Sequence, residues 1–275
     1  MRQASEPSPI ELGRGATAVR AATCLLLLGL VLTPALPAQA GGLWLPLRGV
    51  IAAGRANAVT AGARDPNALT INPANLALID GHVLLVDAAY LDMWLTFDRA
   101  DGTARNGEAI SFEPVENIAP GIVTPSLLFT TDLGTDEWGL GVGVYTPWGA
   151  RARYPTDGAQ RYSVVDLTAS IMVYQSVGLA WRPHPRVAVG ASFQNLISIL
   201  DGVGVASTYV GLWGEPEDTD LDSLVHVRAV DYFTPSGSIG VWAEPLDGFE
   251  IGASFQVSAA VEDTAAVFET QLPAH

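Results

Sequence analysis

Alternating apolar and polar positions dominate the chain after residue 82. Between residues 163 and 181 one face of alternate positions carries Val165, Leu167, Ala169, Ile171, Val173, Val177, Leu179 and Trp181, and the other carries Asp166, Thr168, Ser170, Ser176 and Gly178. A period of two residues is typical of a β-strand with one apolar face. The same pattern recurs along the chain and predicts seven strands. The clearest segments are 138–148, 163–181, 187–199 and 249–257, and less regular ones are 83–97, 122–131 and 236–243.

The connections between these strands alternate between long and short. Long ones span 98–121, 149–162 and 201–235, and short ones span 132–136, 182–185 and 244–247. The strands have about ten residues, aromatic flanks, and glycine, serine and glutamine on one face. Together with the alternating loop lengths, these features are typical of a transmembrane β-barrel with a polar interior. The predicted fold is therefore an all-β, antiparallel transmembrane barrel.

The strand count suggests an incomplete barrel. Seven is an odd number, and no closing strand is evident before His275. Open strand edges carry unpaired backbone groups, each of which costs several kcal/mol in hydrocarbon. We expect residues 82–275 to form only about the first half of the barrel, completed by missing sequence, by a second chain or not at all.

The first forty residues have the features of a secretory signal. Arg2, Arg14 and Arg20 precede an apolar stretch at 21–32, and an Ala-Gln-Ala sequence ends at Ala40. The stretch is shorter than the roughly 20 residues of a membrane-spanning helix, so we predict a signal peptide cleaved after Ala40. The only cysteine, Cys24, lies within it, so the mature chain has no disulfide.

The charge and hydropathy of the chain argue against some classes of protein function. The chain has 14 basic residues, all arginines, against 29 acidic ones, and a net charge of -15 excludes a nucleic-acid partner. The apolar fraction of 49% and the mean hydropathy of +0.27 are high for a secreted soluble protein. Beyond the signal, no apolar stretch is long enough for a spanning helix, so strands must present this apolar surface.

Several short motifs resemble the FadL family of outer-membrane transporters of long-chain fatty acids and hydrocarbons. The likeness extends from about Gly41 to the C-terminus. The Asn-Pro-Ala segment and the glycine-rich third strand are its most specific parts. The motifs are Asn72-Pro73-Ala74, Asn117-Ile118-Ala119-Pro120, the stretch Trp138-Gly-Leu-Gly-Val-Gly-Val-Tyr-Thr-Pro-Trp-Gly149, Tyr154-Pro155 and Arg161-Tyr162.

The resemblance implies an N-terminal hatch at residues 41–81, inside a barrel of roughly fourteen strands. It also implies a ligand pocket at the mature N-terminus and a lateral exit at an inward kink of the third strand, where proline cannot donate to the ladder. Basic residues that hold the ligand carboxylate in characterised members have no counterpart in 194–205. The implied sites are the hatch motif Asn72, Pro73 and Ala74, the pocket residues Leu43 and Trp44, and the gate Thr146, Pro147, Trp148 and Gly149.

Other candidate sites have simpler interpretations. Gly139, Gly141 and Gly143 have the period of a strand, so we interpret them as packing against the hatch rather than as a dinucleotide loop. The acidic loop could bind calcium but lacks the features of an EF-hand, so a solvated loop is favoured. The four histidines lack metal-ligand spacing. The acidic residues of that loop are Glu215, Glu217, Asp218, Asp220 and Asp222.

The leading hypothesis is passive uptake of a hydrophobic small molecule across a bacterial outer membrane, with lateral exit after a hatch movement. The expected partners are that ligand, outer-membrane lipid and lipopolysaccharide; the oligomeric state is left open. No catalytic constellation, metal site or cofactor is expected. The alternatives are a structural or adhesive barrel whose plug never opens, and a secreted soluble β-protein such as a hydrolase.

Overall fold

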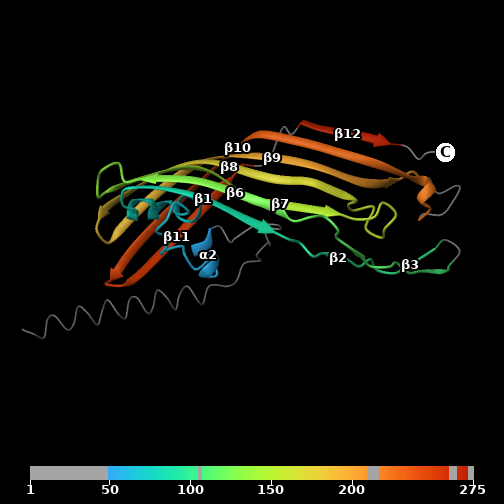
Figure 1. Cartoon of the computed structure of the whole chain (residues 1–275), viewed down its shortest axis with the longest axis horizontal. Helices are drawn as coiled ribbons and strands as arrows, with labels where there is room; N and C mark the ends of the chain where they lie inside the picture. Colours follow the sequence, from blue (N-terminus) through green and yellow to red (C-terminus); the bar gives the residue numbers. More distant parts are fainter. Residues whose placement is uncertain (1–48, 105–106, 210–216, 260–264, 272–275) are drawn as a thin grey trace, which may run out of the picture. The chain divides into compact units, whose positions relative to one another are not determined.

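An antiparallel sheet forms most of the part of the chain that the computed structural model describes, residues 49–104, 107–209, 217–259 and 265–271. Its strand order is β1-β6-β7-β8-β9-β10-β11, and β12 also pairs with β10 (Figure 1). Sequential strands are therefore spatial neighbours. The strands are β1 (His82–Leu91), β6 (Ile122–Thr131), β7 (Trp138–Arg153), β8 (Asp166–His184), β9 (Val187–Ser207), β10 (Asp222–Leu246), β11 (Phe249–Ser258) and β12 (Ala265–Gln271).

Short elements precede the sheet and occupy its long connections. Between β1 and β6, two small ribbons form by antiparallel pairing of β2 with β5 and of β3 with β4. No helix in the described residues is long and apolar enough to cross a membrane. The short elements are α2 (Val50–Gly54), α3 (Ala68–Ile71), η1 (Pro73–Leu78), β2 (Thr96–Phe97), β3 (Gly102–Thr103), β4 (Ala109–Ile110), β5 (Val115–Glu116) and η2 (Thr219–Leu221).

The later strands are longer than the sequence pattern predicts. The segment 201–235 was expected to be a long loop, but β9 continues to Ser207 and β10 begins at Asp222, with Asp222 opposite Ser207. That prediction is wrong because these extensions contain glycines and charged residues such as Asp201 and Arg228, which are typical of loops, although Val203, Val205, Val225 and Val227 still alternate with their neighbours. Strand β12 was also missed; it pairs with residues 224–230 of β10, beyond the part that pairs with β11.

The two faces of the sheet differ in what covers them. The apolar face exposes large hydrophobic side chains from every long strand, and Trp138 of β7 stacks on Trp181 of β8 with ring centroids 6.0 Å apart. Exposed side chains on this face include Leu84, Val86, Leu127, Val142, Val144, Val177, Leu179, Val189, Phe193, Ile239, Val241, Ile251, Phe255 and Val257.

The opposite face, here called the packed face, carries the N-terminal segment, residues 49–81. Element η1 contacts β7, β8, β9 and β10, and α3 contacts β8. Buried apolar side chains of the segment and of five strands, β6 to β10, form one cluster, so the core lies between segment and sheet. Its most buried members are Val59, Ala68, Leu69, Ala74, Leu76, Leu128, Tyr145, Tyr174, Ala180 and Ala188.

Asp132 joins the end of the N-terminal segment to the turn between β6 and β7. Its Oδ2 accepts a hydrogen bond from the Gly81 amide at 2.7 Å, and its Oδ1 accepts one from the Gly134 amide at 2.9 Å. Both glycines have a φ of +71°, a conformation that a side chain would disfavour. The hydrogen bonds from Gly134 and Gly81 hold the pKa of the Asp132 carboxyl below its ordinary value of 3.8.

We expect Asp132→Asn to destabilise the protein at pH 7 and to make no difference in strong acid. A depressed pKa in the folded state means that the carboxylate stabilises the fold above the unfolded pKa of about 3.9 and loses that effect as pH falls through the folded value. Urea unfolding in detergent micelles at pH 7 and near pH 2.5 measures this. An equal gap between wild type and variant at both pH values would contradict the assignment.

Candidate functional site

Four glycines of the sheet let the N-terminal segment lie directly on the strand backbone of the packed face. Gly139 of β7 faces Leu76, Gly190 of β9 faces Pro73, Gly240 of β10 faces Asn72 and Gly252 of β11 faces Ala61. A β-carbon at any of these positions would come within 3.0 Å of the segment. Only glycine permits so close an approach. We call these four residues the glycine row.

Asn72 anchors the segment at the centre of this contact. Its side chain is fully buried, and its Nδ2 donates to the carbonyl oxygens of Thr60 at 2.9 Å and Val241 at 3.0 Å. Its Oδ1 accepts from the Ala74 amide at 3.1 Å and caps η1, whose first residue is Pro73. Proline suits that position because its missing N–H would have no helical partner there. The three predicted motif residues thus lie together against β9 and β10.

The glycine-rich third strand behaves as predicted at two of its three positions. Gly139 lies against the Leu76 backbone, and Gly141 lies against the Leu76 side chain. Gly143 instead faces Leu128 of the neighbouring strand β6, so it makes room for the sheet's own side chain. The prediction of packing against the segment is therefore confirmed for Gly139 and Gly141 and wrong for Gly143.

A hydrogen-bonded group of uncharged side chains lies on the packed face beside the segment. Ser192 and Ser238 hydroxyls are 2.6 Å apart, and Gln194 donates to Ser192 at 3.2 Å. Gln256 donates to Gln194 Oε1 at 3.0 Å and to the Tyr174 hydroxyl at 3.2 Å. Its members come from β8, β9, β10 and β11. We call this group the polar patch.

Aromatic rings continue the polar patch toward β7. The ring of Tyr174 lies 5.5 Å from that of Tyr145 and 5.8 Å from that of Trp148, both in tilted arrangements. Tilted pairs at this spacing are favourable because ring edges approach ring faces. The packed face therefore offers an aromatic wall from β7 and β8 next to hydroxyl and amide groups from β8–β11.

Backbone pairing between β6 and β7 stops partway along both strands. Their register runs from Thr131 opposite Leu140 to Ser126 opposite Tyr145 and goes no further. The next two pairs would place Pro125 opposite Thr146 and Thr124 opposite Pro147, so a residue without an N–H stands on each strand at the break. The ladder between β7 and β8 also shifts register between Tyr145 and Trp148. The predicted interruption is thus found, and it includes Thr146, Pro147, Trp148 and Gly149.

Asn117 holds β7 beyond the interruption. Its Oδ1 accepts from the amides of Arg153 at 2.8 Å and Ala119 at 3.1 Å, and its Nδ2 donates to the Met93 carbonyl at 2.8 Å. Ile118 also donates its amide to the Arg153 carbonyl at 2.9 Å. The Asn117-Ile118 motif therefore replaces β6 as the partner of β7 at its far end. The stretch of β7 without a β6 partner is bounded on both sides.

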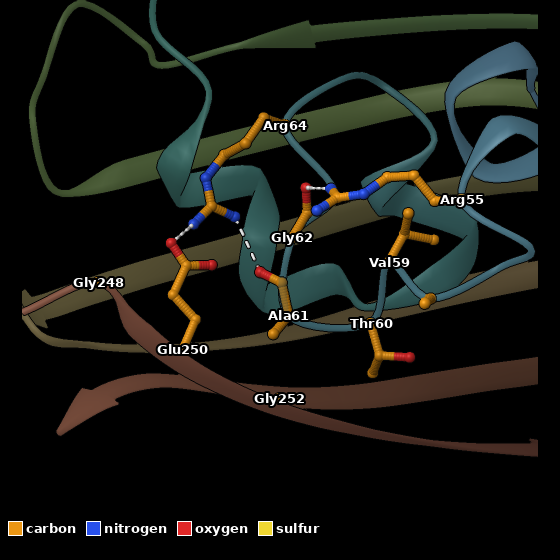
Figure 2. A pocket seen from close by; sticks show the side chains of 10 residues that line it. Arg55, Val59, Thr60, Ala61, Gly62, Arg64, Gly248, Glu250 and Gly252 are labelled. Atoms are coloured by element: carbon orange, nitrogen blue, oxygen red, sulfur yellow. Dashed lines mark hydrogen bonds and ion pairs between the residues drawn. The ribbon is translucent and has the colours of Figure 1, made fainter. Parts of the chain in front are cut away.

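A pocket of about 570 Å³ lies where the N-terminal segment meets β11 (Figure 2). Arg64 donates to Glu250 at 2.8 Å and to the Ala61 carbonyl at 2.9 Å, and its guanidinium lies 5.4 Å from the ring centroid of Trp242. Arg55 donates to the Gly62 carbonyl at 3.4 Å on the other side of the pocket. Arg64 fastens the segment to β10 and β11 at the end of the sheet that bears the short turns.

Arg161 connects three of the long loops at the opposite end. Its side chain is only 4% exposed; it donates to Asp222 at 2.7 Å and to Glu217 at 3.1 Å. Glu217 also accepts two hydrogen bonds from Arg99, at 2.7 and 3.0 Å, and Tyr162 donates to Asp222 at 3.0 Å. Burial, followed by this bond to Asp222, raises the pKa of the Tyr162 hydroxyl. We call these five residues the arginine network.

The arginine network corrects the interpretation of the acidic loop as fully solvated. Glu217 and Asp222 are partners of arginine, whereas the Asp218 side chain caps η2 through the Asp220 amide; Glu215 lies outside the described residues. Within the described ranges, no group of three or more histidine, cysteine, aspartate or glutamate side chains could hold a metal. His226 contacts Asp201 at 2.6 Å.

The predicted pocket residues cannot be compared with the structure, and two residues of the site had no predicted role. Leu43, Trp44 and the signal peptide lie outside the described residues. Arg161 and Asn117 had no predicted role, although both belong to motifs that carry the family resemblance. Each is a polar residue of such a motif that lies outside the predicted strands, and this feature could have indicated a structural role.

We expect Gly190→Ala to destabilise the protein by about 1–3 kcal/mol, the usual cost of overpacking. Its β-carbon would lie 2.5 Å from the Pro73 carbonyl group, so the segment must move. Because Arg55 and Arg64 are trypsin sites, cleavage there should also accelerate. The control is Gly204→Ala on the same strand, where the nearest atom would be 4.0 Å away. Equal cleavage rates in the two variants would rule out the close contact.

We expect Arg161→Met to destabilise the long-loop end by about 3–5 kcal/mol, because the buried carboxylate of Asp222 loses its arginine, while Glu217 keeps only Arg99. Urea unfolding and protease cleavage within residues 154–165 measure the effect. Arg153→Met is the matched control: Arg153 is 47% exposed in its ion pair with Asp166, and such surface pairs contribute about 0–1 kcal/mol. A similar small loss in both variants would show that the network is not structural.

Solved structures with the same fold support the sequence prediction. A Pseudomonas aeruginosa FadL homologue aligns with a TM-score of 0.66 and 17% identity, over 78% of this chain and 52% of that one. The Pseudomonas putida toluene transporter TodX aligns with a TM-score of 0.50 and 14% identity, over 86% of this chain and 60% of that one. This chain therefore spans little more than half the length of either. No curated protein matches it significantly.

A family model provides the assignment. The model described as outer membrane protein transport protein (OMPP1/FadL/TodX) matches residues 31–269, most of the chain. The predicted family, the antiparallel β-barrel fold class and the outer-membrane location are confirmed by these matches. The chain belongs to the OMPP1/FadL/TodX family of outer membrane transport proteins.

Proposed function

We propose that the protein takes up hydrophobic small molecules passively across the bacterial outer membrane. The observation that supports this most directly is the seating of the N-terminal segment on the glycine row. It is held by contacts between small residues, by Asn72 and by Arg64, beside a patch of uncharged side chains. The described strand ladders do not include this segment, so it can shift without unfolding the sheet.

The proposed route follows the packed face. Residues 41–81 act as the hatch, with Asn72, Pro73 and Ala74 as its anchor, and Leu43 and Trp44 line the pocket together with the polar patch. The cargo enters at the long loops and leaves sideways at Thr146, Pro147, Trp148 and Gly149. The end of the β6–β7 register at Tyr145 supports this exit, because no backbone ladder has to break there.

The chemistry of the polar patch favours an uncharged cargo. Hydroxyl and amide groups of Tyr174, Ser192, Gln194 and Gln256 already bond to one another and need no charged partner. Within the class of long-chain fatty acids and hydrocarbons, we therefore favour hydrocarbons. Binding would come from apolar burial at about 25 cal/mol per Å².

The proposal includes neither catalysis nor an energy source. No cofactor is required, because a hydrophobic molecule moves down its own gradient through the site. A structural or adhesive barrel with a fixed plug is the alternative, and an uptake measurement distinguishes the two because such a barrel transports nothing.

We expect cells that carry the chain in their outer membrane to take up a labelled alkane faster than cells without it, because lipopolysaccharide excludes apolar molecules. Pro147→Ala should lower this uptake by about tenfold, since alanine restores an N–H with which β7 can pair to β6. Pro183→Ala, an exposed proline near a short turn, is the control. Normal uptake by Pro147→Ala would exclude the kink as the exit, and no uptake by any form would favour the alternative.

A further inference from the structure

The interruption between β6 and β7 is closed by side chains rather than by backbone pairing. Ile122 and Thr124 of β6 both approach Gly149 of β7, although the register between the strands has already ended. A β-carbon at residue 149 would lie 2.6 Å from Cδ1 of Ile122 and 3.7 Å from Cγ2 of Thr124. The end of the Ile122 side chain thus occupies the space that a side chain at residue 149 would need.

Contacts of this kind are weak and reversible. A single carbon–carbon contact gains only about 0.1–0.2 kcal/mol, whereas an amide hydrogen bond broken in an apolar medium loses about 4–6 kcal/mol. Rotation of the Ile122 side chain therefore clears Gly149 without breaking the ladder on either side. The Ser126–Tyr145 pair and the Asn117–Arg153 hydrogen bond limit the length over which this can happen.

We propose that Ile122, seated against Gly149, sets the bulk of the hydrophobic molecule that can pass between β6 and β7. This rests on the proposed function, since it assumes lateral exit at the interruption. Ile122 is half-buried on the packed face, and its neighbour Val123 is 62% exposed on the apolar face. The cargo would reach Ile122 from the aromatic wall of Tyr145 and Trp148, and would leave on the apolar face of the sheet.

The test compares uptake of a slender and a bulky hydrocarbon, hexadecane and pyrene, by cells that carry the full chain. Ile122→Ala removes three carbon atoms beside Gly149 and should raise the pyrene-to-hexadecane uptake ratio by about tenfold, the lower range for methylene discrimination in hydrophobic pockets. Val123→Ala, which shortens the adjacent side chain on the opposite face, should leave the ratio unchanged.

A second pair of variants separates size selection from damage to the fold. Gly149→Ala should lower pyrene uptake on its own, because its β-carbon meets Ile122 Cδ1. In the Ile122→Ala background the same change should have little effect, because that atom is gone. Tryptic resistance of the N-terminal segment serves as the readout for folding in every variant.

The outcomes distinguish the two proposals. Uptake with an unchanged ratio in Ile122→Ala, or additive effects in the double variant, would overturn the role of Ile122 and leave the proposed function standing. No uptake of either hydrocarbon by the unmodified chain would overturn the proposed function, and the role of Ile122 with it. A raised ratio and a non-additive double variant would support both.

Discussion

Close approach of the N-terminal segment to the sheet is the constraint on which the rest of this structure depends. At the glycine row the strands present no side chain, so Leu76, Pro73, Asn72 and Ala61 of the segment lie directly against the strand backbone. A segment packed this closely must satisfy its buried polar groups with protein partners. Its short helices and the buried amide of Asn72 do so. The small residues of the segment and the glycines of the strands are therefore both needed for this close approach.

The same requirement explains why β7 is irregular. Its first half carries glycine at every second position, of which Gly139 and Gly141 accommodate the segment, and it pairs with β6 from Leu140 to Tyr145. Beyond Tyr145 the segment no longer lies against it, and aromatic side chains fill the packed face instead. Pro125 of β6 and Pro147 of β7 lack an N–H where the β6–β7 ladder ends. Beyond that point Asn117 provides the hydrogen bonds to β7 that β6 does not. Strand β7 is thus hydrogen-bonded to β6 at one end and to Asn117 at the other, and its register with β6 is interrupted between them.

The sequence predicted the features that depend on alternation and on small residues. Strands β6, β7, β8 and β11 and the start of β9 were placed within a few residues, and contact of Gly139 and Gly141 with the segment followed from their period. The family resemblance supplied the motif at Asn72. These predictions succeeded because burial on one side imposes a pattern that a sequence displays directly.

What the sequence did not predict lies where glycines and charged residues obscure the strand pattern. The outer parts of β9 and β10 carry ionic side chains such as Asp201 and Arg228, so they resemble a loop. The arginine network joins residues more than fifty positions apart, and nothing in the local pattern of Arg161 indicates Asp222 as its partner. Long-range ion pairs have no period, so only the folded register reveals them.

The length of the strands determines where a molecule first meets this protein. Strands β9 and β10 contain 21 and 25 residues, about 70 and 80 Å at 3.3 Å per residue, whereas about 9–11 residues suffice to cross a bilayer. Among the described residues of these strands, large exposed apolar side chains lie no further toward the long loops than Leu200 and Tyr232. Strands β9 and β10 are therefore much longer than a hydrocarbon layer requires, and their extra length lies toward the long loops. On the proposed route, an arriving molecule meets the tips of these loops before it reaches the membrane-spanning part of the sheet.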